Sequence, residues 1–173
     1  LDSSDRLGLA APSGFGKTTF CKILAGYEQP DEGQVLLDGK PLSEYKGYCP
    51  VQLIWQHPQE AVNPRRKMKT VLEEGGVLDE RLIHGLGIEK EWMERYPGEL
   101  SGGELQRFCI ARALGEKTSF LLADEITAML DLITQSQIWN FLLEEVRSRE
   151  IGLLVVSHSE PLLQRICTGR IQL

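Results

Sequence analysis

Long apolar runs are missing from this sequence. A membrane-spanning helix needs about 18 or more consecutive apolar residues, whereas the apolar run at 151–157 is short and ends at His158. Internal repeats, low-complexity tracts and sustained heptads are also missing, which leaves an ordinary globular domain as the expectation for a chain with 42% hydrophobic and 25% charged residues. Any role at a membrane is therefore expected to depend on a partner.

Closely spaced cysteines are missing too. Cys21, Cys49, Cys109 and Cys167 form no C-x-x-C pair, so neither a zinc site nor a disulfide framework is expected. The simplest interpretation is four reduced thiols of a cytosolic protein.

An excess of basic residues is absent as well. The formal net charge of -6 argues against a broad nucleic-acid-binding surface, so no nucleic-acid partner is predicted. One basic cluster, Arg65, Arg66, Lys67 and Lys69, is either a local binding patch or simply a solvated face.

Strand and helix patterns alternate along most of the chain. Alternation of this kind predicts an α/β fold whose mainly parallel sheet is flanked by helices, with a small antiparallel portion turned at Asp38 and Gly39. Predicted strands cover residues 7–10, 35–37, 48–55, 120–123 and 153–157, and predicted helices cover 16–25, 103–114, 134–149 and a short stretch after Pro161. Gly26 is expected to close the first helix. Residues 70–96 favour short helices broken by glycines, which predicts a small helical insertion.

A phosphate-binding loop is predicted where the first strand gives way to a helix. The segment APSGFGKT at 11–18 fits the spacing G-x-x-x-x-G-K-[ST] except that Ala11 replaces the first glycine. Backbone N–H groups at the helix start would converge on phosphate oxygens, with Lys17 near the β- and γ-phosphates and the Thr18 hydroxyl on Mg²⁺. A strand-to-helix turn without a ligand is the alternative. The predicted ATP-binding positions are Ser13, Gly14, Phe15, Gly16, Lys17, Thr18 and Thr19.

Two carboxylates end the apolar strand at 120–123. Asp124 and Glu125 are expected at the carboxyl edge of the sheet, beside the phosphate-binding loop. Asp124 would hold Mg²⁺, and Glu125 would orient and polarise the water that attacks the γ-phosphate. Surface charge or a helix cap is the alternative for this pair.

A second anion site is predicted at the start of a later helix. In LSGGELQR at 100–107, Ser101, Gly102 and Gly103 open a helix and leave a hydroxyl and free N–H groups at its positive end. A Ser-capped helix alone is the alternative. This segment resembles the signature motif of ATP-binding cassette (ABC) proteins, with Glu104 where that family more often has glutamine.

Three further residues match the family in order and spacing. The resemblance covers most of the chain from Leu7 to His158, and it implies P-loop ATPase chemistry with ATP and Mg²⁺. It implies that Gln56 touches Mg²⁺ and water, that Asp131 couples two nucleotide sites across a dimer, and that His158 contacts the γ-phosphate. His57 and His84 match no functional position, and Trp55, Trp92 and Trp139 are interpreted as packing residues.

The resemblance also predicts partners. The stretch 55–65, which contains Gln56 and an Asn-Pro-Arg triplet, is similar to the loop of oligopeptide, dipeptide and nickel importers. It implies the ATPase subunit of a membrane transporter, with permease subunits, a second nucleotide-binding subunit and, indirectly, an extracytoplasmic solute-binding protein. That subunit would lie at the cytoplasmic face of the cell membrane.

The predicted organisation is one cassette domain over 1–173, in which a helical subdomain at about 68–115 carries the signature. The chain opens on Leu1 and lacks the family's upstream adenine-stacking aromatic, so an N-terminal part is expected to be missing. A soluble ATPase acting on nucleic acid or ribosomes, and a poorly active cassette, remain as alternatives.

Overall fold

The elements alternate as the sequence predicts. A computed structural model describes residues 1–10, 12, 14–76 and 79–172. Its strands are β1 (Arg6–Ala10), β2 (Leu36–Leu37), β3 (Lys40–Pro41), β4 (Val51–Ile54), β5 (Phe120–Asp124), β6 (Gly152–Val156) and β7 (Gly169–Gln172). Its α-helices are α1 (Lys17–Leu24), α2 (Met68–Glu74), α3 (Glu80–Gly85), α4 (Gly102–Ala113), α5 (Leu132–Ser148) and α6 (Glu160–Ile166). Four short 3₁₀ helices are η1 (Leu42–Glu44), η2 (Pro58–Glu60), η3 (Lys90–Glu94) and η4 (Pro97–Glu99).

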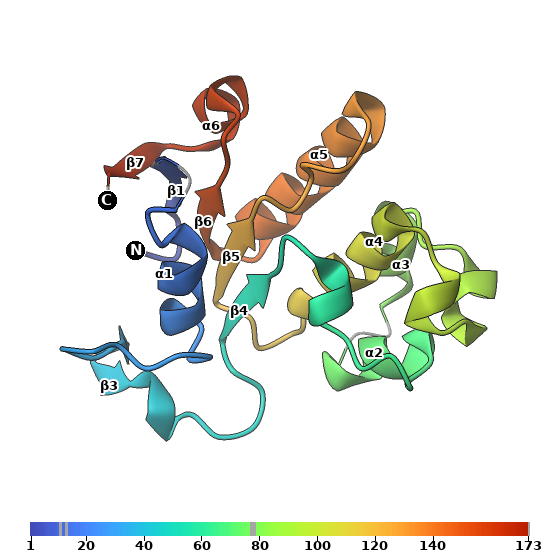
Figure 1. The fold of residues 1–173 in the computed structure, drawn as a ribbon, viewed down its shortest axis with the longest axis horizontal. Coiled ribbons are helices and arrows are strands. Elements are labelled where there is room, and N and C mark those ends of the chain that lie inside the picture. The colour runs from blue at the N-terminus through green and yellow to red at the C-terminus, as the bar shows by residue number, and fades with distance from the viewer. Residues whose placement is uncertain (11, 13, 77–78, 173) are drawn as a thin grey trace.

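A five-stranded parallel sheet forms the centre of the molecule, in the order β4-β5-β6-β1-β7 (Figure 1). The first strand lies between the last two: Leu7 pairs with Leu154 on one side and with Gly169 on the other. The separate pair β2 and β3 is antiparallel, which confirms the predicted small antiparallel portion. Asp38 and Gly39 both have positive φ there, 52° and 75°, as a two-residue hairpin turn requires.

The two faces of the sheet bury different clusters because successive side chains along a strand point to opposite sides. Leu121 and Leu153 pack into the larger cluster with α2 to α6, whereas Leu122 and Leu154 pack into a smaller one with α1 and the hairpin. Helix α1 therefore lies on one side of the sheet and α4 and α5 on the other (Figure 1). Both faces are covered, as expected for a parallel sheet.

Gly26 closes helix α1 as predicted, two residues after its last helical residue Leu24, and has φ 77°. The Gly26 N–H donates to Ile23 O at 3.0 Å and the Tyr27 N–H to Lys22 O at 2.8 Å, the paired bonds of a glycine-closed helix end.

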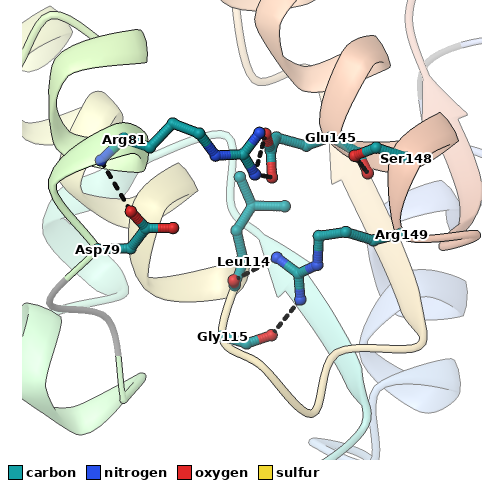
Figure 2. Close-up of polar contacts among 7 residues, drawn as sticks. All are labelled: Asp79, Arg81, Leu114, Gly115, Glu145, Ser148 and Arg149. Carbon is teal, nitrogen blue, oxygen red and sulfur yellow. Dashed lines mark hydrogen bonds and ion pairs between the residues drawn. The ribbon is translucent and has the colours of Figure 1, made fainter.

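Polar contacts tie the helical segment to the core helix α5 (Figure 2). Arg81 of α3 places Nη2 at 2.8 Å from Oε1 and 2.9 Å from Oε2 of Glu145, whose side chain is 1% exposed. Arg149 donates to the carbonyls of Leu114 and Gly115 at 2.7 and 2.6 Å. Burial raises the pKa of Glu145, and the nearby Arg81 opposes this rise. A buried carboxylate of α5 thus depends on a cation from the neighbouring helix α3.

Element boundaries differ from the prediction at several ends. The strand predicted over 48–55 begins only at Val51, because Pro50 has no N–H for the ladder and its carbonyl accepts from Ser119 and Phe120 instead. Helix α5 begins at Leu132 rather than 134, because Asp131 caps it. Strand β7 was not predicted.

The remaining predictions concern single residues. His57 and His84 are exposed, Trp139 is buried, and the four cysteines are free thiols. None of the helices in the described ranges is long and apolar enough to cross a membrane.

Candidate functional site

The carboxyl ends of four parallel strands bring the predicted site residues to one edge of the sheet. The phosphate-binding loop follows β1, Gln56 follows β4, Asp124 ends β5 with Glu125 next, and His158 follows β6. Loops after parallel strands meet at this edge, which is where open α/β sheets bind ligands.

The phosphate-binding loop has the backbone that its glycines allow. Gly14 and Gly16 have φ of 84° and 77°, a left-handed conformation that L side chains rarely adopt, and a Cβ at either would meet nothing within 4 Å. Lys17 is buried, with Nζ 3.1 Å from Pro12 O. Phe15 is 61% exposed, and Thr19 is exposed on α1. Ala11 and Ser13 lie outside the described residues, so the Ala11 substitution and the predicted Ser13 contact stay predictions.

Helix α1 and strand β5 are joined by a hydrogen bond between predicted Mg²⁺ ligands. Thr18 Oγ1 donates to Asp124 Oδ2 at 2.6 Å, and Asp124 is 3% exposed. Burial, together with the Asp124 charge, raises the pKa of the Cys21 thiol to about 12. Cys21 is therefore an uncharged packing residue below this pair.

Glu125 contacts two of the other predicted site residues. Its Oε1 lies 2.8 Å from His158 Nε2, and its Oε2 accepts from Gln56 Nε2 at 3.1 Å. The backbone of Glu125 is left-handed, with φ 50°, a conformation that costs a residue with a Cβ about 1–2 kcal/mol. Residues that follow three neighbouring strands thus fix the orientation of one carboxylate, as a proton acceptor or water-orienting group requires.

The signature segment forms a capped helix start. The Ser101 hydroxyl accepts from the Glu104 N–H at 3.3 Å, and the Glu104 carboxylate accepts from the Ser101 N–H at 2.7 Å, so the two form a capping box. These bonds hold the pKa of Glu104 below its usual value. A Cβ on Gly103 would lie 2.9 Å from Leu130 Cδ2. Glycine is thus what lets the loop before Asp131 approach the start of α4.

Asp131 caps α5. Its Oδ1 accepts from the N–H groups of Ile133 and Thr134, both at 3.0 Å. Hydrogen bonds from Thr134, and a weaker one from Ile133, hold the pKa of Asp131 below its usual value. Met129, Leu132 and Ile133 beside it are 70%, 81% and 73% exposed.

The structure brings some of the predicted residues together and leaves others apart. Lys17, Thr18, Gln56, Asp124, Glu125 and His158 gather at the sheet edge. Ser101, Gly102 and Gly103 open α4, which lies on the other side of the sheet from α1 (Figure 1).

A family model described as ABC transporter matches residues 1–128 of the chain. The chain belongs to the ABC transporter family. Its α/β fold is that of the family's ATP-binding cassette, and it is a member of the family's ATPases.

Curated relatives include import ATP-binding proteins. The chain is 33% identical over 185 positions to the nickel import ATP-binding protein NikE of Rhodospirillum rubrum, covering 96% of this chain and 67% of that protein. It is also 33% identical over 185 positions to the glutathione import ATP-binding protein GsiA of Pectobacterium atrosepticum, covering 94% of this chain and 29% of that protein. The chain therefore spans about two thirds of NikE and less than a third of GsiA.

Solved cassette structures share the fold. The dimeric post-hydrolysis structure of the ATP-binding cassette MJ0796 bound to ADP and Pi superposes with a TM-score of 0.85 at 23% identity, covering 100% of this chain and 82% of that one. An ATP-binding subunit of another ABC transporter gives a TM-score of 0.83 at 20% identity, covering 99% of this chain and 75% of that one.

Sequence reasoning missed one polar residue that reaches the site. Gln106 is 3% exposed on α4 and donates through Nε2 to Trp55 O at 3.2 Å. The available signal was a glutamine inside the signature helix, one turn before Cys109 and Ile110 on the same face.

Proposed function

We propose that this chain binds ATP with Mg²⁺ at the carboxyl edge of the sheet and hydrolyses it. The observation that carries the proposal is the fixed carboxylate of Glu125, held through one oxygen by Gln56 and through the other by His158, next to the Thr18–Asp124 pair. A carboxylate aimed in this way beside a phosphate-binding loop is suited to orient water for in-line attack.

The residues at this edge fit Mg²⁺ bound together with a nucleotide. A hydroxyl, a carboxylate and an amide oxygen, from Thr18, Asp124 and Gln56, are the hard oxygen donors that Mg²⁺ prefers. Mg²⁺ bound in this way takes most of its ligands from phosphates and water, so it needs few from the protein. When bound, Mg²⁺ would neutralise charge developing between the β- and γ-phosphates.

The chain's own residues would bind the phosphates and activate the attacking water. The N–H groups from Gly14 to Thr19 would cradle the phosphates at the start of α1, and Lys17 would add a positive charge there. Glu125 would accept a proton from the attacking water, and His158 would contact the γ-phosphate while restraining the Glu125 carboxylate.

A second cassette would complete each nucleotide site. Ser101, Gly102 and Gly103 offer an anion-binding start to α4, which lies on the side of the sheet away from α1. One chain would therefore contribute a different half to each of two nucleotide sites. The exposed apolar Met129, Leu132 and Ile133 around Asp131 support a protein partner at this face.

We further propose that this dimer energises the import of a small solute of the peptide or nickel class through membrane permease subunits. The cassette would span 1–173, dock through a helical subdomain at about 68–115, and lie peripherally at the cytoplasmic face of the membrane. A solute-binding protein outside the membrane would be an indirect partner. The names of the relatives and the Asn63-Pro64-Arg65 loop after Gln56 support this branch.

Phosphate release from ATP, with and without copurified permease subunits, tests the proposal. We expect Mg²⁺-dependent turnover that rises when the permease is present. A chain that binds no ATP with Mg²⁺, or that turns over at the uncatalysed rate in both preparations, contradicts ATP hydrolysis. Turnover unaffected by any membrane partner contradicts the transport role alone.

A further inference from the structure

Three side chains on one face of α4 donate to carbonyls that are three residues apart in the loop that begins at Trp55. The bonds join residues 51 positions apart and run from Gln106 Nε2 to Trp55 O (3.2 Å), from Cys109 Sγ to Pro58 O (3.8 Å) and from Arg112 Nη1 to Ala61 O (2.7 Å). Donors and acceptors both recur every third residue, so the signature helix and the loop at 55–61 lie in register along three contacts. We call this set the α4 ladder.

The buried position of Gln106 on α4 is unfavourable for a polar side chain. It is 3% exposed, and its Oε1 is buried without a hydrogen-bond partner among the described residues. A buried amide oxygen without a partner is destabilising, whereas leucine or methionine would fill the same space without that penalty. What a glutamine adds here is the N–H that it donates to Trp55 O.

That bond fixes the peptide that leads into the site. The carbonyl of Trp55 and the N–H of Gln56 belong to one planar unit, so a donor on the Trp55 oxygen also sets the orientation of the Gln56 backbone. The Gln56 side chain then reaches Glu125 Oε2 at 3.1 Å. A line of contacts therefore runs from the signature helix through one peptide plane to the carboxylate.

The ring of Trp55 is held from the other side of the sheet. Tyr27 packs edge-on with ring centroids 5.3 Å apart, and Lys22 Nζ lies 5.2 Å from the Trp55 centroid. The ring of Trp55 packs near the end of α1, and its carbonyl is bound by α4. These two contacts restrict the movement of Trp55 and therefore of the adjoining Gln56.

We infer that Gln106 is a positioning residue for hydrolysis: its amide holds the Trp55–Gln56 peptide so that Gln56 stays against Glu125. This inference rests on the proposed ATP hydrolysis. It places the control of Gln56 in one side chain of the signature helix, rather than in the loop that carries it.

Kinetics of Gln106→Met test the role, since methionine keeps the volume and removes the donor. We expect kcat to fall by about 10- to 100-fold, the typical effect of misplacing a site group by about 1 Å, with KM for ATP changed by less than about twofold. Combining it with Gln56→Ala should cost no more than Gln56→Ala alone. Cys109→Ala, which removes the long middle contact of the α4 ladder, is the matched control and should keep kcat. A raised KM with unchanged kcat, or additive losses, overturns the proposal.

Gln106→Glu provides a rescue by pH. A protonated carboxylic acid can donate to Trp55 O and a carboxylate cannot, so its activity relative to the unmodified chain should rise as the pH falls. A ratio that does not change with pH overturns the donor role.

Hydrogen exchange tests the same contact without relying on turnover. In Gln106→Met, the amides at 55–57 and 59–61 should exchange faster, while those of β5 stay as in the unmodified chain. Unchanged exchange at 55–61 overturns the inference whatever the kinetics. If the unmodified chain hydrolyses no ATP, the proposed function fails, while this exchange measurement still decides the contact.

Discussion

Glu125 and His158 meet at 2.8 Å across the ends of two neighbouring strands, β5 and β6. The other oxygen of Glu125 faces Gln56 beyond β4, on the opposite side of β5. The carboxylate is therefore restrained from both sides by neighbours in the sheet, and its backbone is left-handed at the same point.

Replacing Glu125 with glutamine should abolish turnover while leaving nucleotide binding intact. Glutamine keeps the size of the side chain and cannot accept a proton, so we expect hydrolysis to fall by about 10²–10⁴-fold. Phosphate release measures the rate, and size-exclusion chromatography with ATP should reveal a trapped dimer. Glu144→Gln, at an exposed position of α5, is the control. A Glu125→Gln chain that still turns over would remove Glu125 from the mechanism.

Thr18→Val should weaken nucleotide binding only when Mg²⁺ is present. The hydroxyl bonds Asp124 at 2.6 Å, and valine keeps the shape of the side chain without an oxygen ligand. Affinity for ATP with Mg²⁺ should fall by about tenfold, the effect of about 1.4 kcal/mol, while affinity in a metal chelator stays the same. Fluorescent-nucleotide titration measures both, and Thr18→Ser should behave like the unmodified chain. Equal losses with and without Mg²⁺ would contradict a metal role.

Ser101→Asp should separate helix capping from phosphate binding. Aspartate caps a helix as well as serine does, so the thermal midpoint should stay close to that of the unmodified chain. Its negative charge would face the γ-phosphate of the partner's nucleotide, and turnover should fall by at least about tenfold. Ser101→Asn has the same size without the charge and is the matched control. Normal turnover in Ser101→Asp would place Ser101 away from nucleotide.

Local patterns were enough to predict much of the sheet edge. The Gly16-Lys17-Thr18 turn, the carboxylates that end β5 and the residues that end β4 and β6 are each specified by a few neighbouring positions, and their strands are neighbours in one sheet. The chemical roles of these residues remain predictions.

Other features depend on contacts between distant residues. Strand β7 has only four residues, and it forms because β1 pairs with it across more than 150 positions of sequence. The donor role of Gln106 is likewise visible only when α4 lies along the loop after β4. The start of α5 is a different case, because its signal is local: the Asp131 side chain caps the helix, which begins at Leu132, two residues before the predicted start at 134.

Arg81→Ala should destabilise the fold by leaving Glu145 buried and unpaired. Removing one partner of a fully buried pair costs about 3–5 kcal/mol, but the Arg81 side chain is 58% exposed, so we expect about 2 kcal/mol. Urea unfolding measures the loss. Adding Glu145→Gln to Arg81→Ala should restore most of the stability, because no charge is then buried. A double variant as unstable as the single one would show that Arg81 acts through packing instead.

Glu145→Gln should also change how stability depends on pH. Burial raises the folded-state pKa of Glu145, which Arg81 and Arg149 oppose and the charges of Asp79 and Glu144 reinforce. Stability linked to this group is fully present below the unfolded pKa of about 4.3 and is lost as the pH rises through the higher folded-state pKa. The glutamine variant should therefore gain stability over the unmodified chain as the pH rises from about 4 to 8. Parallel unfolding curves across that range would contradict the raised pKa.

The place of β1 between β6 and β7 bears on how the chain is made. The strand that leads into the phosphate-binding loop leaves the ribosome long before its partners, because Leu7 pairs with Leu154 and with Gly169. Loop closure over such separations is slow, and an unpaired apolar strand is exposed to aggregation while it waits. Nascent chains that stop before residue 152 lack both partners of β1, so the ability to bind ATP should appear only after β6 has been synthesised.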